Sequence, residues 1–450
     1  MLIIISDLHL GDGTCGKSIS SDAFYVFAER ITKMARRASW RTDGSYRPLR
    51  EVNILLLGDI LDPLHSTLWL DTKPNTPEYT RPWTDRKNPT YAQKLKQITQ
   101  AILEKHRDSL EVLRDIKVQI PRELSSQRGW EESKDLVEVD VHLHYMIGNH
   151  DWYYGIPGEP FDEIRAEIVA ALGLSQTSSP FPYRLEDDPV LAEKLASYKV
   201  YAHHGDYYDH FNYNVEKGRL ASALGDVFTV EMLNRFPLEV AARLPELSKG
   251  VIENLGEISH VRPTLATWLW VSSQIKHNGL QSNMQQKIKK IWDDLGHEFL
   301  KLDVVRSLDK KFQFDSVDKL EVALQISERT SVKTMNDLAL WIQEEIWGGE
   351  ISYAKKALKE PAFVENKASY IVYGHTHHHE VVPLDTLEKR TVHDDKFYFN
   401  SGTWYTYFDL SIHKPHEQKF VPYQVVSLLA FYRDDQRKGH RFETLSGTFS

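Results

Sequence analysis

Short apolar runs alternate with amphipathic segments over the first 206 residues of the chain. Runs that predict buried strands occur at residues 2–6, 52–57, 141–147 and 198–203. Apolar side chains recur at helical spacing over residues 22–38, 91–117 and 161–172, and residues 62–90 are polar and rich in Pro and Thr, which predicts a long loop. Alternation of strand and helix is typical of an α/β core.

The pattern changes after residue 206, and no strand is predicted from 207 to 365. Two stripes at helical spacing occur there, one at Met284, Ile288, Ile291, Trp292, Leu295, Phe299 and Leu302, the other at Met335, Leu338, Ile342 and Ile346. Further strands are predicted at 370–373, 396–400, 404–410 and 423–432. We therefore expect an α/β core of residues 1–206 and 366–450, interrupted by an all-helical insertion of residues 207–365. The insertion is either a cap that narrows access to a site or an interaction subdomain for dimerisation.

Length and composition agree with this organisation. A chain of 450 residues is too long for one compact core, and its net charge of −9 implies no general attraction to nucleic acid or anionic membranes. The single cysteine, Cys15, excludes an internal disulfide and fits a reducing compartment. The N-terminus lacks the basic lead and long apolar run of a signal peptide, and no apolar window has the length of a membrane span. We expect a soluble cytoplasmic protein.

Five phrases place metal-ligand side chains directly after apolar runs. They are Ser6-Asp7-Leu8-His9, Gly58-Asp59-Ile60-Leu61-Asp62, Gly148-Asn149-His150-Asp151, His203-His204-Gly205-Asp206 and Gly374-His375-Thr376-His377. The carboxyl ends of strands line the crevice where α/β proteins bind ligands, so we expect the five phrases to converge. Residues i and i+2 of an extended chain share a face, which predicts that Asp7 and His9 hold one ion together, as do His375 and His377. Together the phrases supply the Asp, His and Asn ligands that a two-metal hydrolytic site requires.

These phrases resemble the five motifs of the calcineurin-like metallophosphoesterase superfamily, Asp-x-His, Gly-Asp-x-x-Asp, Gly-Asn-His-Asp/Glu, His-Gly-x and Gly-His-x-His. The resemblance covers the predicted core and implies a β-sandwich flanked by helices, with two divalent metals about 3.5–4 Å apart. It implies that the first metal is held by Asp7, His9, Asp59 and His377. It implies that the second is held by Asp59, Asn149, His204 and His375, with Asp59 bridging the two.

The resemblance also assigns roles to residues beside the ligands. His150 would be the general acid or a transition-state donor, and Asp151 would orient His150 or its loop. His203 competes with His204 for the fourth motif, and we prefer His204 because the family ligand directly precedes a glycine. Asp62 either hydrogen-bonds a ligand histidine or caps the turn that follows it.

The chemistry of such a site follows from charge. Two divalent ions neutralise a phosphate ester and lower the pKa of a bridging water, and the resulting hydroxide attacks phosphorus. A proton from His150 would stabilise the leaving oxygen. Mixed nitrogen and oxygen ligands favour Mn²⁺, with Fe or Zn²⁺ as alternatives.

Three functions are compatible with these residues. The first is hydrolysis of a phosphomonoester, phosphodiester or pyrophosphate bond in a small nucleotide-like or nucleotide-sugar substrate. Some phrases are similar to those of UDP-diacylglucosamine pyrophosphohydrolases, in which the third motif ends in Arg-Asp rather than His150-Asp151. The second is a DNA or RNA nuclease like the repair exonucleases of the superfamily, and the third is a non-catalytic interaction protein braced by metal. Aromatic side chains at 152–154, 207–213 and 404–405 either wall a pocket for a base or sugar or pack the insertion against the core.

Overall fold

The larger of two sheets contains three neighbouring parallel strands from the first half of the chain. The computed structural model describes residues 1–124, 135–262, 264–308, 320, 324, 352–385, 395–410 and 420–449. In the larger sheet, β1 (Leu2–Ile5) pairs with β2 (Glu51–Leu57), and β2 pairs with β4 (Leu136–Met146). The other strands of this sheet are β3 (Val118–Pro121), β6 (Val261–Arg262), β10 (Thr406–Leu410), β11 (Phe420–Phe431) and β12 (Phe442–Phe449). Their order is β3-β4-β2-β1-β11-β10-β6, with β12 paired to β11.

The smaller sheet packs face to face on the larger one. Its order is β5 (Val200–Ala202), β7 (Tyr370–Tyr373), β9 (Lys396–Ser401) and β8 (His379–Asp385), and only β8 runs antiparallel to its neighbour. Alternate side chains of a strand point to opposite faces, so Leu2 and Ile4 of β1 meet Val372 and Phe399 between the sheets. Ile3 points the other way, toward helices.

Helices cover both outer faces, which gives four layers. The larger sheet is covered by α1 (Asp22–Ala38), α2 (Pro89–Lys105), α3 (Arg107–Arg114) and α4 (Glu159–Leu172). On α1, Phe24, Phe27 and Ile31 are buried because their spacing places them on one face. The smaller sheet is covered by α14 (Ser352–Ala357) and α15 (Pro361–Val364), and α5 (Pro189–Ala196) packs at the end of the core between the sheets.

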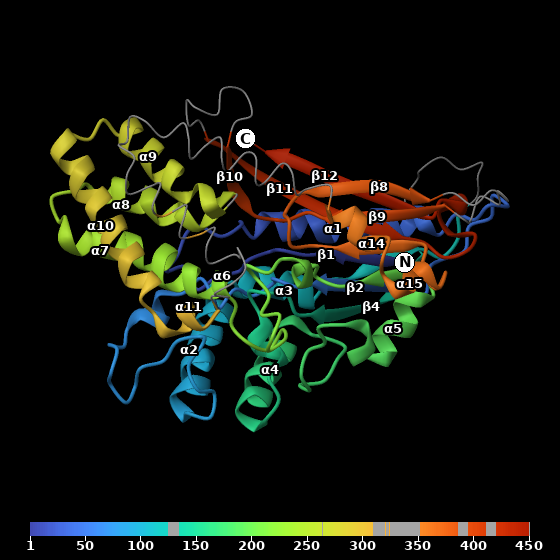
Figure 1. The fold of residues 1–450 in the computed structure, drawn as a ribbon. Helices are drawn as coiled ribbons and strands as arrows, with labels where there is room; N and C mark the ends of the chain where they lie inside the picture. The colour runs from blue at the N-terminus through green and yellow to red at the C-terminus, as the bar shows by residue number, and fades with distance from the viewer. Residues whose placement is uncertain are drawn as a thin grey trace.

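A second group of helices lies at one end of the molecule, at the left of Figure 1. It comprises α6 (Leu224–Phe228), the π-helix η5 (Thr229–Asn234), α7 (Arg235–Arg243), α8 (Lys249–Leu255), α9 (Thr267–His277), α10 (Ser282–Leu300) and α11 (Asp303–Leu308). These helices have their own apolar core, in which Trp268 stacks on Trp292. A buried ion pair of 2.7 Å between Arg81 Nε and Glu231 Oε1 ties them to the core of the chain.

Trp152 makes a second such tie, because its Nε1 donates to Asp226 Oδ2 at 3.1 Å. Trp152 is 1 % exposed. Of the two roles predicted for the aromatic side chains, packing of the insertion on the core is therefore the one that Trp152 has.

Short 3₁₀ segments complete the elements. They are η1 (Thr67–Leu70), η2 (Trp152–Gly155), η3 (Leu185–Asp187), η4 (Asp206–Tyr208), η6 (Gly256–His260), η7 (Thr264–Ala266) and η9 (Gln436–Gly439). No helix among the described residues combines the length and the apolar character needed to cross a bilayer.

The mixed α/β class predicted from the sequence is confirmed, and two element predictions are wrong. The helix predicted over 91–117 is two helices, because the chain leaves helical geometry at His106, whose Nε2 bonds the Gly11 carbonyl at 2.8 Å. The segment 207–365 does contain a strand, β6, which is only two residues long and so too short to show a period. The stripe from Met335 to Ile346 lies outside the described residues, and the domain boundaries stay a prediction.

Candidate metal centre

All five phrases follow the carboxyl end of a strand, as the sequence predicts. Asp7 follows β1, Asp59 follows β2 and Asn149 follows β4, and these three strands are parallel neighbours. His204 follows β5 and His375 follows β7, which are parallel neighbours in the smaller sheet. The loops of both sheets therefore meet, and the seven side chains predicted as ligands lie together.

Asp7, His9 and His377 form the first of three groups with the spacing of a metal site, since their ligand atoms all lie within 4.8 Å of one another. His9 Nε2 is 3.0 Å from His377 Nε2, which in turn is 3.4 Å from Asp7 Oδ1. Asp7 Oδ1 is buried and accepts no hydrogen bond from the described residues. A buried carboxylate oxygen without a partner is costly, and a cation at this point would satisfy it together with both imidazoles.

Asp59, His204 and His375 form the second group, with the same spacing. Asp59 Oδ2 is 3.1 Å from His204 Nε2 and 3.9 Å from His9 Nε2, so this carboxylate stands between the two groups. Asn149 Oδ1 lies 3.2 Å from His204 Nε2 and 2.9 Å from His375 Nδ1. The amide oxygen therefore faces the same point as the two imidazoles.

Five of these side chains stand on left-handed backbone. Their φ angles are 53° at Asp7, 46° at His9, 54° at Asp59, 69° at His375 and 66° at His377. Such a conformation costs a non-glycine residue about 1–3 kcal/mol, and it persists where the surrounding structure enforces it, often at functional sites. The left-handed backbone also shows that the expectation of one ion held by both His375 and His377 is wrong. The chain from His375 to His377 is not extended, so the two imidazoles belong to different groups instead of sharing one.

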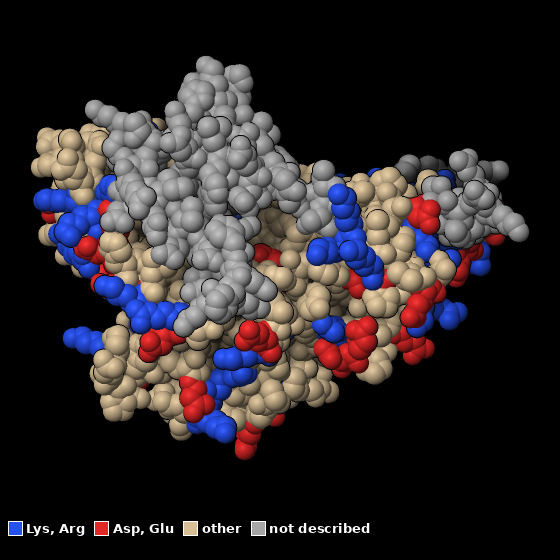
Figure 2. All heavy atoms as spheres, viewed as in Figure 1, with Lys and Arg blue, Asp and Glu red and all other residues tan. Residues whose placement is uncertain are grey.

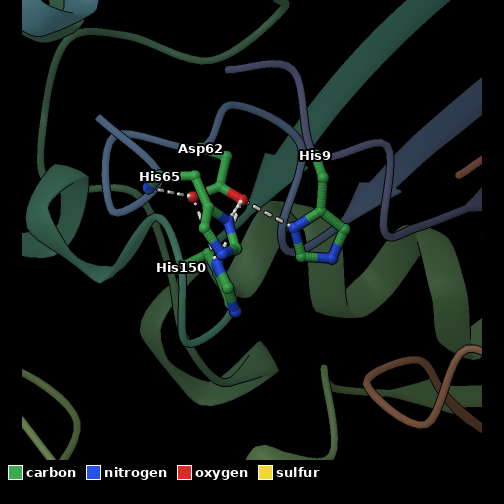
Figure 3. A group of neighbouring side chains, drawn as sticks. All are labelled: His9, Asp62, His65 and His150. Carbon is green, nitrogen blue, oxygen red and sulfur yellow. Dashed lines mark hydrogen bonds and ion pairs between the residues drawn. The ribbon is translucent and has the colours of Figure 1, made fainter. Parts of the chain in front are cut away.

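Asp62 is a hub for three imidazoles (Figure 3). It accepts from His9 Nδ1 at 2.8 Å, from His65 Nδ1 at 2.7 Å and from His150 Nδ1 at 3.1 Å. It also accepts from the His65 backbone N–H at 3.1 Å, so both predicted contacts of Asp62, with a histidine and with the turn, are present. These four residues have metal-site spacing too, but every one of the three Nδ1 atoms is engaged by the carboxylate. The bond to Nδ1 leaves His9 Nε2 directed at the first group.

The negative charge of Asp62 changes the pKa of His150. Burial lowers the pKa of His150, but the carboxylates of Asp62 and Asp59 outweigh burial and raise it to about 9. Burial likewise raises the pKa of Asp62, yet the neighbouring His150 and His65 hold it well below its ordinary value. In the metal-free protein His150 is therefore an imidazolium at neutral pH, and it can donate a proton.

Asp151 braces the loop that carries Asn149 and His150. Its carboxylate accepts from the Gly148 N–H at 2.6 Å, from the Ile60 N–H at 3.0 Å and from the Tyr145 hydroxyl at 2.7 Å. Among the described residues these are its hydrogen bonds, and none joins it to the His150 ring. Of the two roles predicted for Asp151, orienting the loop is the one that these contacts show.

His203, the rival of His204, points elsewhere. Its Nε2 lies 2.8 Å from Glu360 Oε1, which also accepts from the hydroxyls of Tyr208 at 2.7 Å and Tyr373 at 2.6 Å. His204 instead anchors its Nδ1 on the Leu57 carbonyl at 2.9 Å and directs its Nε2 at Asp59.

Two supporting residues are absent from the sequence prediction. Asp209 Oδ2 lies 3.0 Å from His375 Nε2, which fixes the ring with Nδ1 toward the second group. His65 bonds Asp62 as described above. Neither residue belongs to a recurring phrase, and each becomes visible only when the loops are folded.

Glycine is required where ligand side chains approach the backbone. A Cβ atom on Gly148 would lie 2.4 Å from Asp59 Oδ1, and one on Gly374 would lie 2.6 Å from Asp7 Oδ2. Both carboxylates therefore occupy space that any larger residue would fill.

The segment that precedes β10 braces the same loops. Thr403 Oγ1 donates to the Asp7 carbonyl at 2.7 Å, and Asn400 Nδ2 donates to the Gly374 carbonyl at 2.7 Å. These contacts hold the backbone of the loops that carry Asp7 and His375.

No protein-family model matches this chain, and no curated protein matches it.

Proposed function

We propose that the chain is a metal-dependent phosphohydrolase of the calcineurin-like metallophosphoesterase superfamily. The observation that carries the proposal is the pair of groups that flank Asp59, one with Asp7, His9 and His377 and the other with His204 and His375. Their donor set of carboxylate, imidazole and amide suits Mn²⁺, with Fe or Zn²⁺ as alternatives. The layered pair of sheets flanked by helices agrees with the fold that the motifs imply.

When bound, two divalent cations supply Lewis acidity and lower the pKa of water at the site. The side chains of the protein would hold the cations, orient the imidazoles and donate the proton. Asp59 would contact both cations, while Asp62 and Asp209 hold the imidazoles of His9 and His375 in the tautomers that coordinate metal. His150, held on Asp62 through Nδ1, would use its Nε2 to donate a proton to the leaving oxygen.

We propose a small phosphorylated substrate, such as a nucleotide or nucleotide sugar, rather than nucleic acid. A nuclease binds its substrate through a continuous basic surface. On the face drawn in Figure 2, Lys and Arg side chains are interspersed with Asp and Glu over the described surface. The chain as a whole carries a net charge of −9, which favours a small ligand reached through local contacts.

The test is a panel of phosphorylated compounds assayed with added Mn²⁺: a monoester, a bis-ester, a nucleotide sugar and single-stranded DNA. We expect wild type to hydrolyse at least one small ester or pyrophosphate. We expect His150→Ala to reduce kcat by about 10²- to 10⁴-fold while the bound metal is retained. The exposed His440, which follows η9, gives the matched control, since His440→Ala removes a surface imidazole that belongs to none of the metal-spaced groups. A wild-type protein that binds metal and cleaves none of the panel would contradict the proposal, as would cleavage of the DNA alone.

A further inference from the structure

Arg262 stands on a short strand of the helical segment that lies near the candidate metal centre. It is the second residue of β6, which pairs in parallel with β10 and places Arg262 beside Asp409. Two residues earlier, the His260 ring contacts the Tyr405 ring with centroids 4.3 Å apart, and Tyr405 contacts the His9 ring at 5.1 Å. The short strand that carries Arg262 is therefore separated from a predicted metal ligand by one aromatic ring.

Two backbone carbonyls hold the guanidinium of Arg262, and the structure describes no carboxylate that pairs with it. Arg262 Nη1 donates to the carbonyls of Ser259 at 3.0 Å and Val261 at 3.1 Å. Among the described residues, Nε and Nη2 make no hydrogen bond, and no carboxylate forms an ion pair with this side chain. Backbone carbonyls fix the group without cancelling its charge, which leaves a planar pair of N–H donors for another anion.

The charge of Arg262 interacts with several side chains of the candidate metal centre. The guanidinium interacts electrostatically with the carboxylates of Asp7 and Asp62 and with the phenols of Tyr405 and Tyr407. A cation this close to metal ligands is unfavourable when the centre also holds divalent ions, unless an anion lies between them.

We propose that Arg262 binds the phosphoryl oxygens of the substrate on the side away from the metals, so that the helical segment contributes a residue to the binding site. This inference rests on the proposed function. Arg suits the role because its fork of donors matches two phosphate oxygens at once, which a lysine cannot do. The proposal also gives the helical segment a role in substrate binding, since the two-residue pairing of β6 with β10 places Arg262 beside the strand that follows Tyr405, whose ring contacts His9.

The test measures binding of inorganic phosphate to the Mn²⁺-loaded full chain by calorimetry. Arg262→Met removes the charge at nearly constant volume, and we expect it to weaken phosphate binding about 10- to 100-fold. Arg262→Lys keeps the charge and loses the fork, so its affinity should fall between those of wild type and Arg262→Met. Bound Mn²⁺ should be unchanged in both variants because Arg262 is not a ligand. The control is Arg243→Met on α7, whose guanidinium pairs with Glu239 and Asp294 and should leave phosphate affinity as in wild type.

The outcomes distinguish a failure of the role proposed for Arg262 from a failure of the proposed metal-dependent function. If wild type binds Mn²⁺ and phosphate and Arg262→Met binds phosphate within twofold of wild type, the role of Arg262 is wrong while the metal centre stands. If Arg262→Met loses Mn²⁺ as well and Arg262→Lys behaves in the same way, the side chain is structural and the inference is also overturned. If wild type binds no Mn²⁺, the proposed function itself fails.

Discussion

The replacement Asp62→Asn tests whether one carboxylate sets both the orientation and the charge of the centre. Asp62 accepts from His9, His65 and His150 and is 1 % exposed, so its negative charge is screened little by water. An asparagine has nearly the same shape and offers one neutral oxygen in place of two charged ones. The variant therefore removes the charge with little change in packing.

The size of the effect follows from His150. Its pKa is raised from the model-peptide value of 6.5 to about 9, and Asp62 is the largest favourable cause. That difference corresponds to ~3 kcal/mol of preference for the charged imidazole in the folded, metal-free protein. Because the folded pKa lies above the unfolded one, this stabilisation is fully present below pH 6.5 and is lost as the pH rises toward 9.

The assay is an NMR titration of the histidine Cε1–H signals in protein freed of metal by a chelator, with His150→Gln used to assign the resonance. We expect the His150 midpoint near 9 in wild type and a much lower midpoint in Asp62→Asn, because the lowering by burial is then opposed chiefly by Asp59. The surface replacement Asp435→Asn, which breaks pairs with Arg41 and Arg47, should leave the midpoint unchanged. An equal midpoint in wild type and Asp62→Asn would refute the view that Asp62 controls His150.

Two further predictions concern residues outside the predicted ligand set. Burial raises the pKa of Glu360, but hydrogen bonding and the charge of His203 outweigh it and lower the pKa to about 2. Glu360→Gln should therefore lower the free energy of unfolding by ~3 kcal/mol at pH 7. This difference between wild type and variant should shrink as the pH falls from 4.5 toward 2, and urea titrations at several pH values measure it. A difference in stability that does not depend on pH would contradict the prediction. Asp209→Asn should weaken binding of one of the two Mn²⁺ ions by about 10-fold, because the bond that orients His375 loses its charge. Calorimetry with Mn²⁺ measures this, and equal affinities for both ions in the variant and wild type would count against the role of Asp209.

The convergence of the candidate ligand residues is predictable from sequence because each follows a strand that is itself easy to recognise. The apolar runs before Asp7, Asp59 and Asn149 become parallel neighbours, and parallel strands bring their carboxyl ends to one edge. The direction in which each side chain points cannot be predicted from the strands alone. Sequence spacing alone puts His375 and His377 on one face, whereas left-handed backbone at both residues sends them to separate groups.

The supporting residues depend on tertiary contacts that no local pattern encodes. Asp209 reaches His375 across 166 positions of the chain, and His203 reaches Glu360 across 157. β6 has two residues, and its pairing with β10 is decided by the fold of the whole helical segment. A strand of that length carries no periodic signal, so the arrival of Arg262 at the centre could not be foreseen.

Counting the metals bound by the protein tests the central claim most directly. Elemental analysis and electron paramagnetic resonance of Mn²⁺-loaded wild type should give two ions per chain with the spectrum of a spin-coupled pair. Asp59→Asn, which alters the one carboxylate that lies between the two groups, should abolish the coupled spectrum. One uncoupled ion in wild type, or a coupled pair that survives in Asp59→Asn, would contradict the two-metal centre.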